Sequence, residues 1–431
     1  MGDVKDFFNA RSFAVVGASR DENKIGHVIF KNLLESGKPV FPINPKADHI
    51  LRHRAYEDLL DVPQDIDCIV IAIPAKMIPL VLKQAERRNV KCAVIVSASF
   101  SEIGNNDLEE RILRIANEAN IKILGPNSFG FIDPFQKINT TYYEEMPETC
   151  KIAFISQSGA IGSAVLDKIK RVSGFVSVGN SAQLDFSDFI EYYSNDKNTD
   201  VIALYLESLK AGKGKRFIEV CKKSKKPIIV LKSGKSKRGQ AAAKSHTAAL
   251  ASEAGVYSGI LKQAGVIEAR SIRQLFDKAK TLEKYPRLGN KACIITNAGG
   301  LGVLATDHCD ENKIKVPRLK EKTIKKLNKI LPENWSHNNP VDMIGDALAN
   351  DYLQTIQALE KEDFDFFIVL LTPQHMTQEL ETARALTKTK KPVVACFLGG
   401  KKVLEARKFM NKHNILNFGS VRELCEAIGK N

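Results

Sequence analysis

The fold is decided by a short strand, a glycine turn and the start of a helix near the amino end of the chain. These residues read Phe13-Ala-Val-Val-Gly17-Ala-Ser-Arg20, and Lys24-Ile-Gly26 follows soon after. The apolar run has the length of a buried strand, and apolar side chains then recur at helical spacing as far as Leu33. A strand, a glycine turn and a helix in this order are typical of nucleotide-binding α/β units.

Gly17 is interpreted as part of a phosphate-binding turn at a helix start. The glycine pattern of dinucleotide-binding proteins is incomplete, because Ala18 and Ser19 follow Gly17. The turn therefore predicts a phosphate ligand without indicating NAD. The alternative is a glycine that only makes a tight turn.

Residues 11–130 alternate short apolar runs with helical patterns, which predicts a parallel, doubly wound sheet. The runs are Phe13–Val16, Val40–Ile43, Cys68–Ile73, Ala93–Val96 and Ile121–Leu124. Ligands of open α/β sheets bind beyond the carboxyl ends of the strands. Polar or turn residues follow the second, third and fourth runs, in Asn44-Pro-Lys46, Ile73-Pro74-Ala75 and Ser97-Ala-Ser99. We expect them at one edge of the sheet, beside Gly17.

A second alternating segment runs from Lys151 to about Tyr285. Residues 131–150, which contain Pro134 and Pro147, lack clear periodicity and are expected to be a connection. The predicted strands are Ile152–Ile155, Phe175–Val178, Val201–Leu206 and Ile228–Leu231.

The first of these strands ends in Ser156-Gln-Ser158-Gly159-Ala160 and enters a helix. Backbone N–H groups at such a helix start can hold a phosphoryl group, although ordinary N-capping explains the same residues. Glu207 directly follows the strand that ends at Leu206. Its carboxylate could fix the tautomer of a histidine, or it could be a solvated glutamate at a strand end.

The stretch from Lys232 to Glu253 carries His246 in a run of small and basic residues. Its bases are Lys232, Lys235, Lys237, Arg238 and Lys244. Such a run cannot pack a core, so we expect a mobile surface loop whose neighbourhood attracts phosphate. A neutral imidazole is a competent nucleophile toward an activated phosphoryl group. The stretch is interpreted as a phosphoryl carrier arm, and the alternative is a surface or capping histidine.

A third alternating segment follows the turn-rich linker Tyr285–Asn290. Its predicted strands are Ala292–Thr296, Phe366–Leu371 and Val393–Phe397. Asn297-Ala-Gly299-Gly300 opens a helix after the first strand, so Gly299 and Gly300 are further candidates for phosphate binding. The predicted domains are residues 1–130, 131–286 and 287–431.

The amino-acid composition disfavours several classes of function. The chain has 431 residues, 44% hydrophobic and 26% charged, with a formal net charge of +14. The lysines are dispersed without a basic–aromatic motif, so small polyanions or an acidic partner fit better than nucleic acid. No apolar run has membrane-spanning length and the amino end lacks a signal-peptide core. Eight cysteines without CxxC pairs predict no zinc site and no disulfide framework, and indicate a reducing cytoplasm.

Several segments together resemble the α subunit of ADP-forming acetyl-CoA synthetase, a relative of succinyl-CoA synthetase. They are Gly17-Ala-Ser-Arg20 with Lys24-Ile-Gly26, Asn44-Pro-Lys46, Gly125-Pro-Asn127, Ser156-Gln-Ser-Gly159, Lys244-Ser-His246-Thr-Ala-Ala-Leu250 and Asn339-Pro-Val-Asp342. The resemblance covers essentially the whole chain. Two positions depart from the pattern, because Ala248 stands where glycine is common and Ser128 where cysteine is common.

The resemblance implies a Rossmann-like CoA-binding domain followed by two flavodoxin-like ligase domains. It implies a phosphohistidine at His246, steadied by Glu207, with Ser158, Gly159, Ala160, Gly299 and Gly300 near phosphate. It implies CoA binding by Gly17, Ala18, Ser19, Lys24, Gly26, Asn44, Lys46, Ile73, Pro74 and Ser97, and no metal ligands in this chain. ADP and Mg²⁺ are expected on a separate ATP-grasp β subunit, in an α2β2 heterotetramer.

The implied reaction converts acyl-CoA, ADP and phosphate into a carboxylic acid, CoA and ATP through an acyl phosphate. Two alternatives keep the same domains: a succinate–CoA ligase, and a CoA-binding regulatory protein without turnover. A NAD(P)-dependent dehydrogenase is disfavoured by the incomplete glycine pattern.

Overall fold

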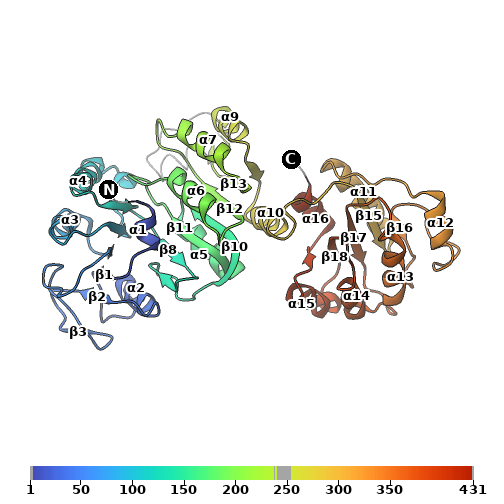
Figure 1. Cartoon of the computed structure of the whole chain (residues 1–431), viewed down its shortest axis with the longest axis horizontal. Helices are drawn as coiled ribbons and strands as arrows, with labels where there is room; N and C mark the ends of the chain where they lie inside the picture. Colours follow the sequence, from blue (N-terminus) through green and yellow to red (C-terminus); the bar gives the residue numbers. More distant parts are fainter. Residues whose placement is uncertain (1–2, 237, 240–253, 430–431) are drawn as a thin grey trace. The chain divides into compact units, whose positions relative to one another are not determined.

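The computed structural model describes residues 3–236, 238–239 and 254–429. The chain divides into two compact units, Met1–Leu275 and Phe276–Asn431, which are described separately (Figure 1). The first unit contains two large sheets and the second contains one. The α/β class with several parallel-sheet domains is confirmed.

The first sheet has the order β2-β1-β5-β6-β7, with all neighbouring strands parallel. Its strands are β1 (Phe13–Val16), β2 (Val40–Ile43), β5 (Cys68–Ile71), β6 (Cys92–Ile95) and β7 (Lys122–Leu124). The helices are α1 (Lys5–Phe8), α2 (Ile25–Leu34), α3 (Ile78–Arg87) and α4 (Asn106–Glu118). A separate hairpin pairs β3 (His49–Ile50) with β4 (His53–Arg54).

The second sheet has the order β14-β13-β12-β10-β11-β8-β9. Its parallel strands are β10 (Glu148–Ser156), β11 (Arg171–Ser177), β12 (Val201–Leu206), β13 (Ile228–Lys232) and β14 (Ile267–Ala269). The helices are α5 (Gly159–Ile169), α6 (Phe186–Asn195), α7 (Gly214–Lys223) and α9 (Ala254–Ala264), and α10 (Ile272–Lys284) begins here. β8 (Gly130–Asp133) and β9 (Ile138–Asn139) extend the sheet as antiparallel strands.

The sheet of the second unit has the order β16-β15-β17-β18-β19, again parallel. Its strands are β15 (Ala292–Thr296), β16 (Val341–Asp342), β17 (Phe366–Leu371), β18 (Val393–Phe397) and β19 (Leu416–Asn417). Its helices are α11 (Gly299–Glu311), α12 (Glu321–Leu327), α13 (Ala349–Leu359), α14 (Glu379–Leu386), α15 (Leu404–Lys412) and α16 (Val421–Ile428).

All three sheets repeat one topology. If the parallel strands of each sheet are numbered along the chain, their order in space is 2-1-3-4-5. In this topology the strand order reverses between strands 1 and 3, and ligands bind beyond the carboxyl ends of that pair. The three crevices therefore lie beyond β1 and β5, beyond β10 and β12, and beyond β15 and β17.

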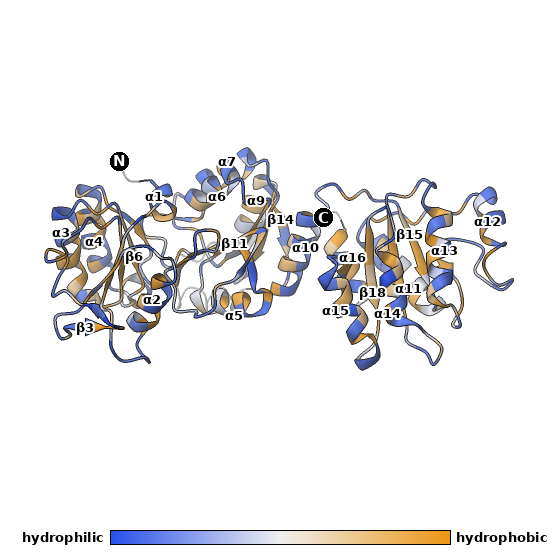
Figure 2. Ribbon diagram, turned by 60° about the horizontal axis from the view of Figure 1, so that its bottom comes forward, coloured by the Kyte–Doolittle hydropathy of each residue, from blue (hydrophilic) through white to orange (hydrophobic). Residues whose placement is uncertain are grey.

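A shared core joins the two sheets of the first unit. Phe13 and Val15 of β1 belong to a cluster that also contains Ile155 and Val176 of the second sheet. Ala14 and Val16, the alternate residues of β1, belong to a second cluster that also contains residues of α3 and α4. The strands are buried on both faces, as parallel sheets require, and their orange colour in Figure 2 shows the same apolar interior.

The segment 131–150 corrects one expectation. The lack of periodicity predicts a connection, but most of β8 and all of β9 lie within the segment; β8 pairs with β11, and β9 pairs with β8. Asn32 of α2 donates hydrogen bonds to the carbonyl oxygens of Thr141 (2.9 Å) and Tyr143 (3.0 Å), so the segment also packs on the first sheet. Such short strands carry no periodicity of their own, because their pairing is set by tertiary contacts.

Candidate functional site

The crevice of the second sheet brings together the start of α5 and the turn after β12. Gln157 makes this connection: its Oε1 accepts hydrogen bonds from the backbone N–H groups of Glu207 and Ser208, each at 2.9 Å. Gln157 Nε2 donates to Ser208 Oγ at 3.3 Å. Gln157 therefore holds Glu207 close to Ser158, as predicted for these two residues. The sequence pattern predicts no role for Gln157 itself.

The start of α5 offers backbone donors. Ser158 is the N-cap, and its Oγ accepts from the Ile161 N–H at 3.3 Å. The first bond within the helix runs from Gly162 N to Ser158 O at 3.0 Å, so Gly159 and Ala160 precede it. A Cβ added to Gly159 would lie 3.0 Å from Phe129 Cβ, so this position is tight. N–H groups at a helix start, with the positive end of the helix dipole, suit a phosphoryl group.

Glu207 is half-buried at the carboxyl end of β12. Burial raises the pKa of Tyr205, and the charge of Glu207 and a hydrogen bond between the two side chains raise it further. Tyr205 thus keeps its proton and contacts the carboxylate.

Lys232 corrects an expectation. The basic run predicts that Lys232 is one of the bases that attract phosphate, but the residue is only 6% exposed. Its Nζ donates to the carbonyl oxygens of Glu207 (2.7 Å) and Ser233 and lies 4.4 Å from the centre of the Tyr257 ring. Burial lowers the pKa of Lys232 to about 8, Glu207 opposes this shift and Lys235 adds to it.

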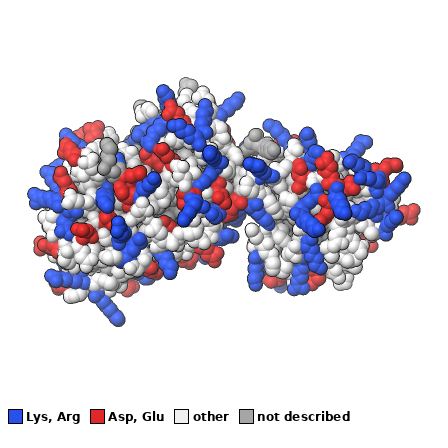
Figure 3. Space-filling model, viewed as in Figure 1, with Lys and Arg blue, Asp and Glu red and all other residues white. Residues whose placement is uncertain are grey.

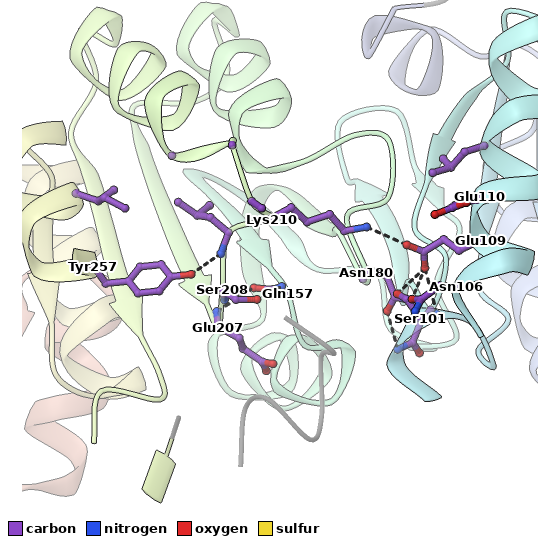
Figure 4. A pocket seen from close by; sticks show the side chains of 18 of the residues that line it. Ser101, Asn106, Glu109, Glu110, Gln157, Asn180, Glu207, Ser208, Lys210 and Tyr257 are labelled. Atoms are coloured by element: carbon purple, nitrogen blue, oxygen red, sulfur yellow. Dashed lines mark hydrogen bonds and ion pairs between the residues drawn. The ribbon is translucent and has the colours of Figure 1, made fainter. Parts of the chain in front are cut away.

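A cavity of about 820 Å³ opens beside this crevice, within the first unit (Figure 4). One wall comes from α4 of the first sheet and the others from the turns after β11 and β12 and from α9. Its polar side chains include Asn106, Glu109, Glu110, Asn127, Gln157, Asn180, Glu207 and Lys210, and its apolar ones include Leu113, Leu209, Val256, Tyr257 and Ile260.

Glu109 anchors the α4 wall. It is 5% exposed and accepts hydrogen bonds from Lys210 Nζ (2.9 Å), Ser101 Oγ (2.7 Å) and Asn180 Nδ2 (3.0 Å). Burial opposes the ionised form, but these hydrogen bonds and the charge of Lys210 outweigh it, and the pKa of Glu109 lies below its usual value. Figure 4 shows Lys210 reaching across from the turn after β12.

The crevice of the first sheet gathers the residues predicted to bind CoA. Gly17 has a φ of +94°, and a Cβ there would lie 2.4 Å from Ala72 O. A Cβ on Gly26 would lie 2.0 Å from Gly17 O, so α2 starts directly against the turn. Asn44 Nδ2 donates to Ala18 O at 2.7 Å. Both glycines are therefore required by close approach of the main chain.

The remaining predicted residues lie at the same edge. His27 Nδ1 lies 2.9 Å from the carbonyl oxygen of Ser19, and Lys46 N donates to Asn44 Oδ1 at 2.8 Å. Ser97 Oγ donates to Ile73 O at 2.5 Å, next to Pro74, so this hydroxyl joins two strand ends.

These residues fit a phosphate-bearing ligand such as CoA. Lys24 and Lys46 are exposed, and neither forms an ion pair within the described residues. Lys24 is also the N-cap of α2, which places it at a helix start that favours anions. Elsewhere on the surface, Lys and Arg are interspersed with acids on the face shown in Figure 3.

Gly299 and Gly300 lie at the start of α11 in the second unit. A Cβ on Gly299 would lie 2.7 Å from Asp342 Oδ2, so a carboxylate already neighbours this helix start. In the same crevice Asn297 Oδ1 accepts from Thr372 N at 2.9 Å, as Gln157 does at Glu207.

His246 lies outside the described residues, as do Lys237, Lys244 and Ala248. The described part of the chain contains no group of acidic, His and Cys side chains able to hold a metal ion. All eight cysteines fall within the described ranges and are buried free thiols. In these ranges, no helix has both the length and the apolar character needed to cross a bilayer.

Three family models match successive parts of the chain. They are a CoA binding domain at residues 11–134, a succinyl-CoA ligase like flavodoxin domain at 149–282 and a Ligase-CoA domain at 292–429. This combination, with the crevices above, defines the class of CoA-dependent acid ligases.

Similar proteins identify the family within this class. The α subunit of ADP-forming acetate–CoA ligase II from Pyrococcus furiosus is 36% identical, over 98% of this chain and 95% of its own length. ADP-forming acetate–CoA ligase I from Archaeoglobus fulgidus is 40% identical over 96% of this chain. The solved dinucleotide-forming acetyl-coenzyme A synthetase 1 of Ca. Korarchaeum cryptofilum, in complex with phosphate and ADP, superposes with a TM-score of 0.94 at 35% identity, over 99% of this chain and 96% of its own.

The chain belongs to the family of ADP-forming acetate–CoA ligase α subunits. It spans 61% of the length of the A. fulgidus relative and 50% of a second relative, from Methanocaldococcus jannaschii.

Proposed function

We propose that the chain carries the CoA-dependent half of an ADP-forming acyl-CoA synthetase, which converts acyl-CoA, ADP and phosphate into a carboxylic acid, CoA and ATP. The observation that carries this proposal is the link through Gln157, which holds Glu207 beside the helix start at Ser158–Ala160. A carboxylate to orient an imidazole and backbone donors for a phosphoryl group are what a phosphohistidine requires.

The proposed chemistry has two steps on this chain. A phosphate oxygen attacks the thioester carbonyl, the C–S bond breaks, and CoA leaves as an acyl phosphate forms. An imidazole nitrogen of His246 then attacks the phosphorus and releases the carboxylate. Glu207 holds the proton of the other ring nitrogen, and the N–H groups at the start of α5 hold the phosphoryl oxygens. A later transfer to ADP yields ATP.

CoA fits the crevice of the first sheet. The N–H groups near Gly17 and at the start of α2 face the edge where its phosphates would be held, and Lys24 and Lys46 contribute charge. Ile73, Pro74 and Ser97 would border the same ligand.

We further propose three domains, at residues 1–130, 131–286 and 287–431, acting in a reducing cytoplasm. An ATP-grasp β subunit would bind ADP, with Mg²⁺ neutralising its phosphates, in an α2β2 heterotetramer. The naming of two P. furiosus relatives as α subunits supports a partner.

Labelling tests this proposal. Incubation of the chain with acetyl-CoA and radiolabelled phosphate should leave an acid-labile, base-stable label. His246→Ala should abolish the label, whereas the matched change His375→Ala, at an exposed histidine of the second unit, should retain it. A label that survives His246→Ala would show that His246 is not the carrier.

A further inference from the structure

The turn that carries Glu207 is held from three sides. Gln157 binds its N–H groups at Glu207 and Ser208. From β13, Lys232 Nζ donates to the Glu207 carbonyl oxygen at 2.7 Å. From α9, Tyr257 Oη accepts from the Leu209 N–H at 2.8 Å. Each of the three residues of the turn thus has a main-chain group bound by a side chain of another element.

Lys232 and Tyr257 also hold each other. The ammonium lies 4.4 Å from the centre of the ring, and the two residues are 6% and 9% exposed. Lys232 forms no salt bridge among the residues described. Two carbonyl oxygens and an aromatic face lie against its ammonium, and the charge of Glu207 also favours the protonated form. Such a buried ammonium is costly, and a methionine of similar volume would avoid that cost. The charge therefore calls for an explanation other than packing.

We propose that Lys232 and Tyr257 are a positioning pair, which aims the Glu207 carboxylate at the phosphoryl site by fixing the turn from Glu207 to Leu209. The inference rests on the proposed function and deepens it. Both side chains bind main-chain groups of the turn, so the pair acts through Glu207.

The protonation of Lys232 then sets an upper pH limit. Burial lowers its pKa to about 8. The charged and titratable groups around it are Glu207, which directly follows β12, Tyr257 from α9, and Lys235, which pairs with Glu268 of β14 at 3.0 Å. Loss of the proton removes the charge that strengthens both carbonyl bonds and the ring contact. Phosphohistidine formation should therefore fall as the pH rises through about 8.

Lys226 provides a matched control. It precedes β13, as Lys232 ends it, and its Nζ also donates to two carbonyl oxygens, of Tyr193 (2.7 Å) and Asp196. Burial lowers its pKa as well. It lies at the opposite end of the strand from Glu207, so it shares the chemistry of Lys232 without the position.

The test uses the full chain, acetyl-CoA and radiolabelled phosphate, with the initial labelling rate measured from about pH 6.5 to 9.5. Lys232→Met should label roughly tenfold to a hundredfold more slowly at neutral pH, without a fall near pH 8. Lys226→Met should keep the wild-type rate and profile. Tyr257→Phe keeps the ring over Lys232 but frees Leu209 N–H, so it should slow labelling by a few-fold and retain the fall.

CoA binding by calorimetry and thermal unfolding accompany each variant. Unchanged CoA binding with slowed labelling places the defect at Glu207. If Lys232→Met fails to fold, Tyr257→Phe decides: wild-type labelling in that variant overturns the pair. Wild-type labelling with an unchanged alkaline fall in Lys232→Met also overturns it. An unlabelled wild-type chain overturns the proposed function instead.

Discussion

Glu109 Oε1 lies 2.9 Å from Lys210 Nζ, and this contact joins the helix α4 beside the first sheet to the turn after β12 in the second. Asn180, from the turn after β11, donates to the same carboxylate. A single buried carboxylate thus fixes one wall of the cavity relative to the turn that begins at Glu207. The two crevices of the first unit are held in register by this cluster and by the shared core.

Glu109→Gln should lower the free energy of unfolding of the first unit by about 1.5–3 kcal/mol at neutral pH, because it removes charged hydrogen bonds from a buried site. The pKa of Glu109 in the folded chain lies below the ordinary value of 4.5. Its contribution is therefore present above that ordinary value and is lost as the pH falls through the folded one. Denaturant unfolding of both proteins as a function of pH should show the difference shrink in acid.

The neighbouring change Glu110→Gln is the control, since Glu110 is exposed and lines the same cavity. It should change stability by no more than about 0.5 kcal/mol. Equal stability of the two variants at neutral pH would show that the Glu109 cluster contributes little.

Lys46→Glu should weaken CoA binding, with the largest loss at low salt. The change places a negative charge at the crevice edge where the phosphates of CoA are proposed to lie, and salt screens such repulsion. Calorimetric titration with CoA at several salt concentrations measures both effects. Lys83→Glu makes the same charge change at an exposed site on α3 and should bind CoA as the wild type does. If the two variants bind alike, Lys46 does not contact the ligand.

Gly26→Ala should abolish CoA binding and destabilise the first unit, because the added Cβ would lie 2.0 Å from the main-chain oxygen of Gly17. A main-chain atom cannot yield as a flexible side chain does, so we expect a cost of about 1–3 kcal/mol. Gly259→Ala in α9 has nothing within 4 Å of its added Cβ and should be neutral or stabilising by up to about 1 kcal/mol. Thermal unfolding and CoA titration of both variants test this prediction. Gly26→Ala behaving as Gly259→Ala does in both measurements would contradict it.

The long parallel strands could be predicted because each is an apolar run buried on both faces. β1, β2, β12, β15, β17 and β18 have the predicted bounds. The two- and three-residue strands β9, β14, β16 and β19 lack such a signal, and so does the four-residue β8, which pairs antiparallel with β11 and β9. Strand-end position also brought Ser158 and Glu207 to one crevice, as expected from parallel topology.

The supporting side chains could not be predicted, because their roles depend on contacts between distant segments. Gln157, Lys210 and Tyr257 gain their partners only when α4, α9 and the strand ends meet. The burial of Lys232 could not be predicted for the same reason: a lysine in a basic run is expected to be exposed, yet as the last residue of β13 it is buried. One pattern was available but unused: a polar residue directly after the first strand, Gln157 or Asn297, binds the end of the third strand in two of the sheets.

Glu207→Gln tests the proposed role of the carboxylate most directly. The amide keeps the shape of the side chain and an oxygen acceptor, so the turn and its bonds to Gln157 and Lys232, which involve main-chain atoms, should persist. The negative charge that stabilises a protonated imidazole is lost, and a charged hydrogen bond of this kind contributes about 1.5–3 kcal/mol. Label should therefore form on His246 roughly ten- to a hundredfold more slowly, with CoA affinity unchanged. Glu219→Gln, the same change at an exposed site on α7, should label at close to the wild-type rate. Rapid labelling of Glu207→Gln would mean that the histidine is oriented by another group, and that the position of Glu207 beside α5 serves the turn alone.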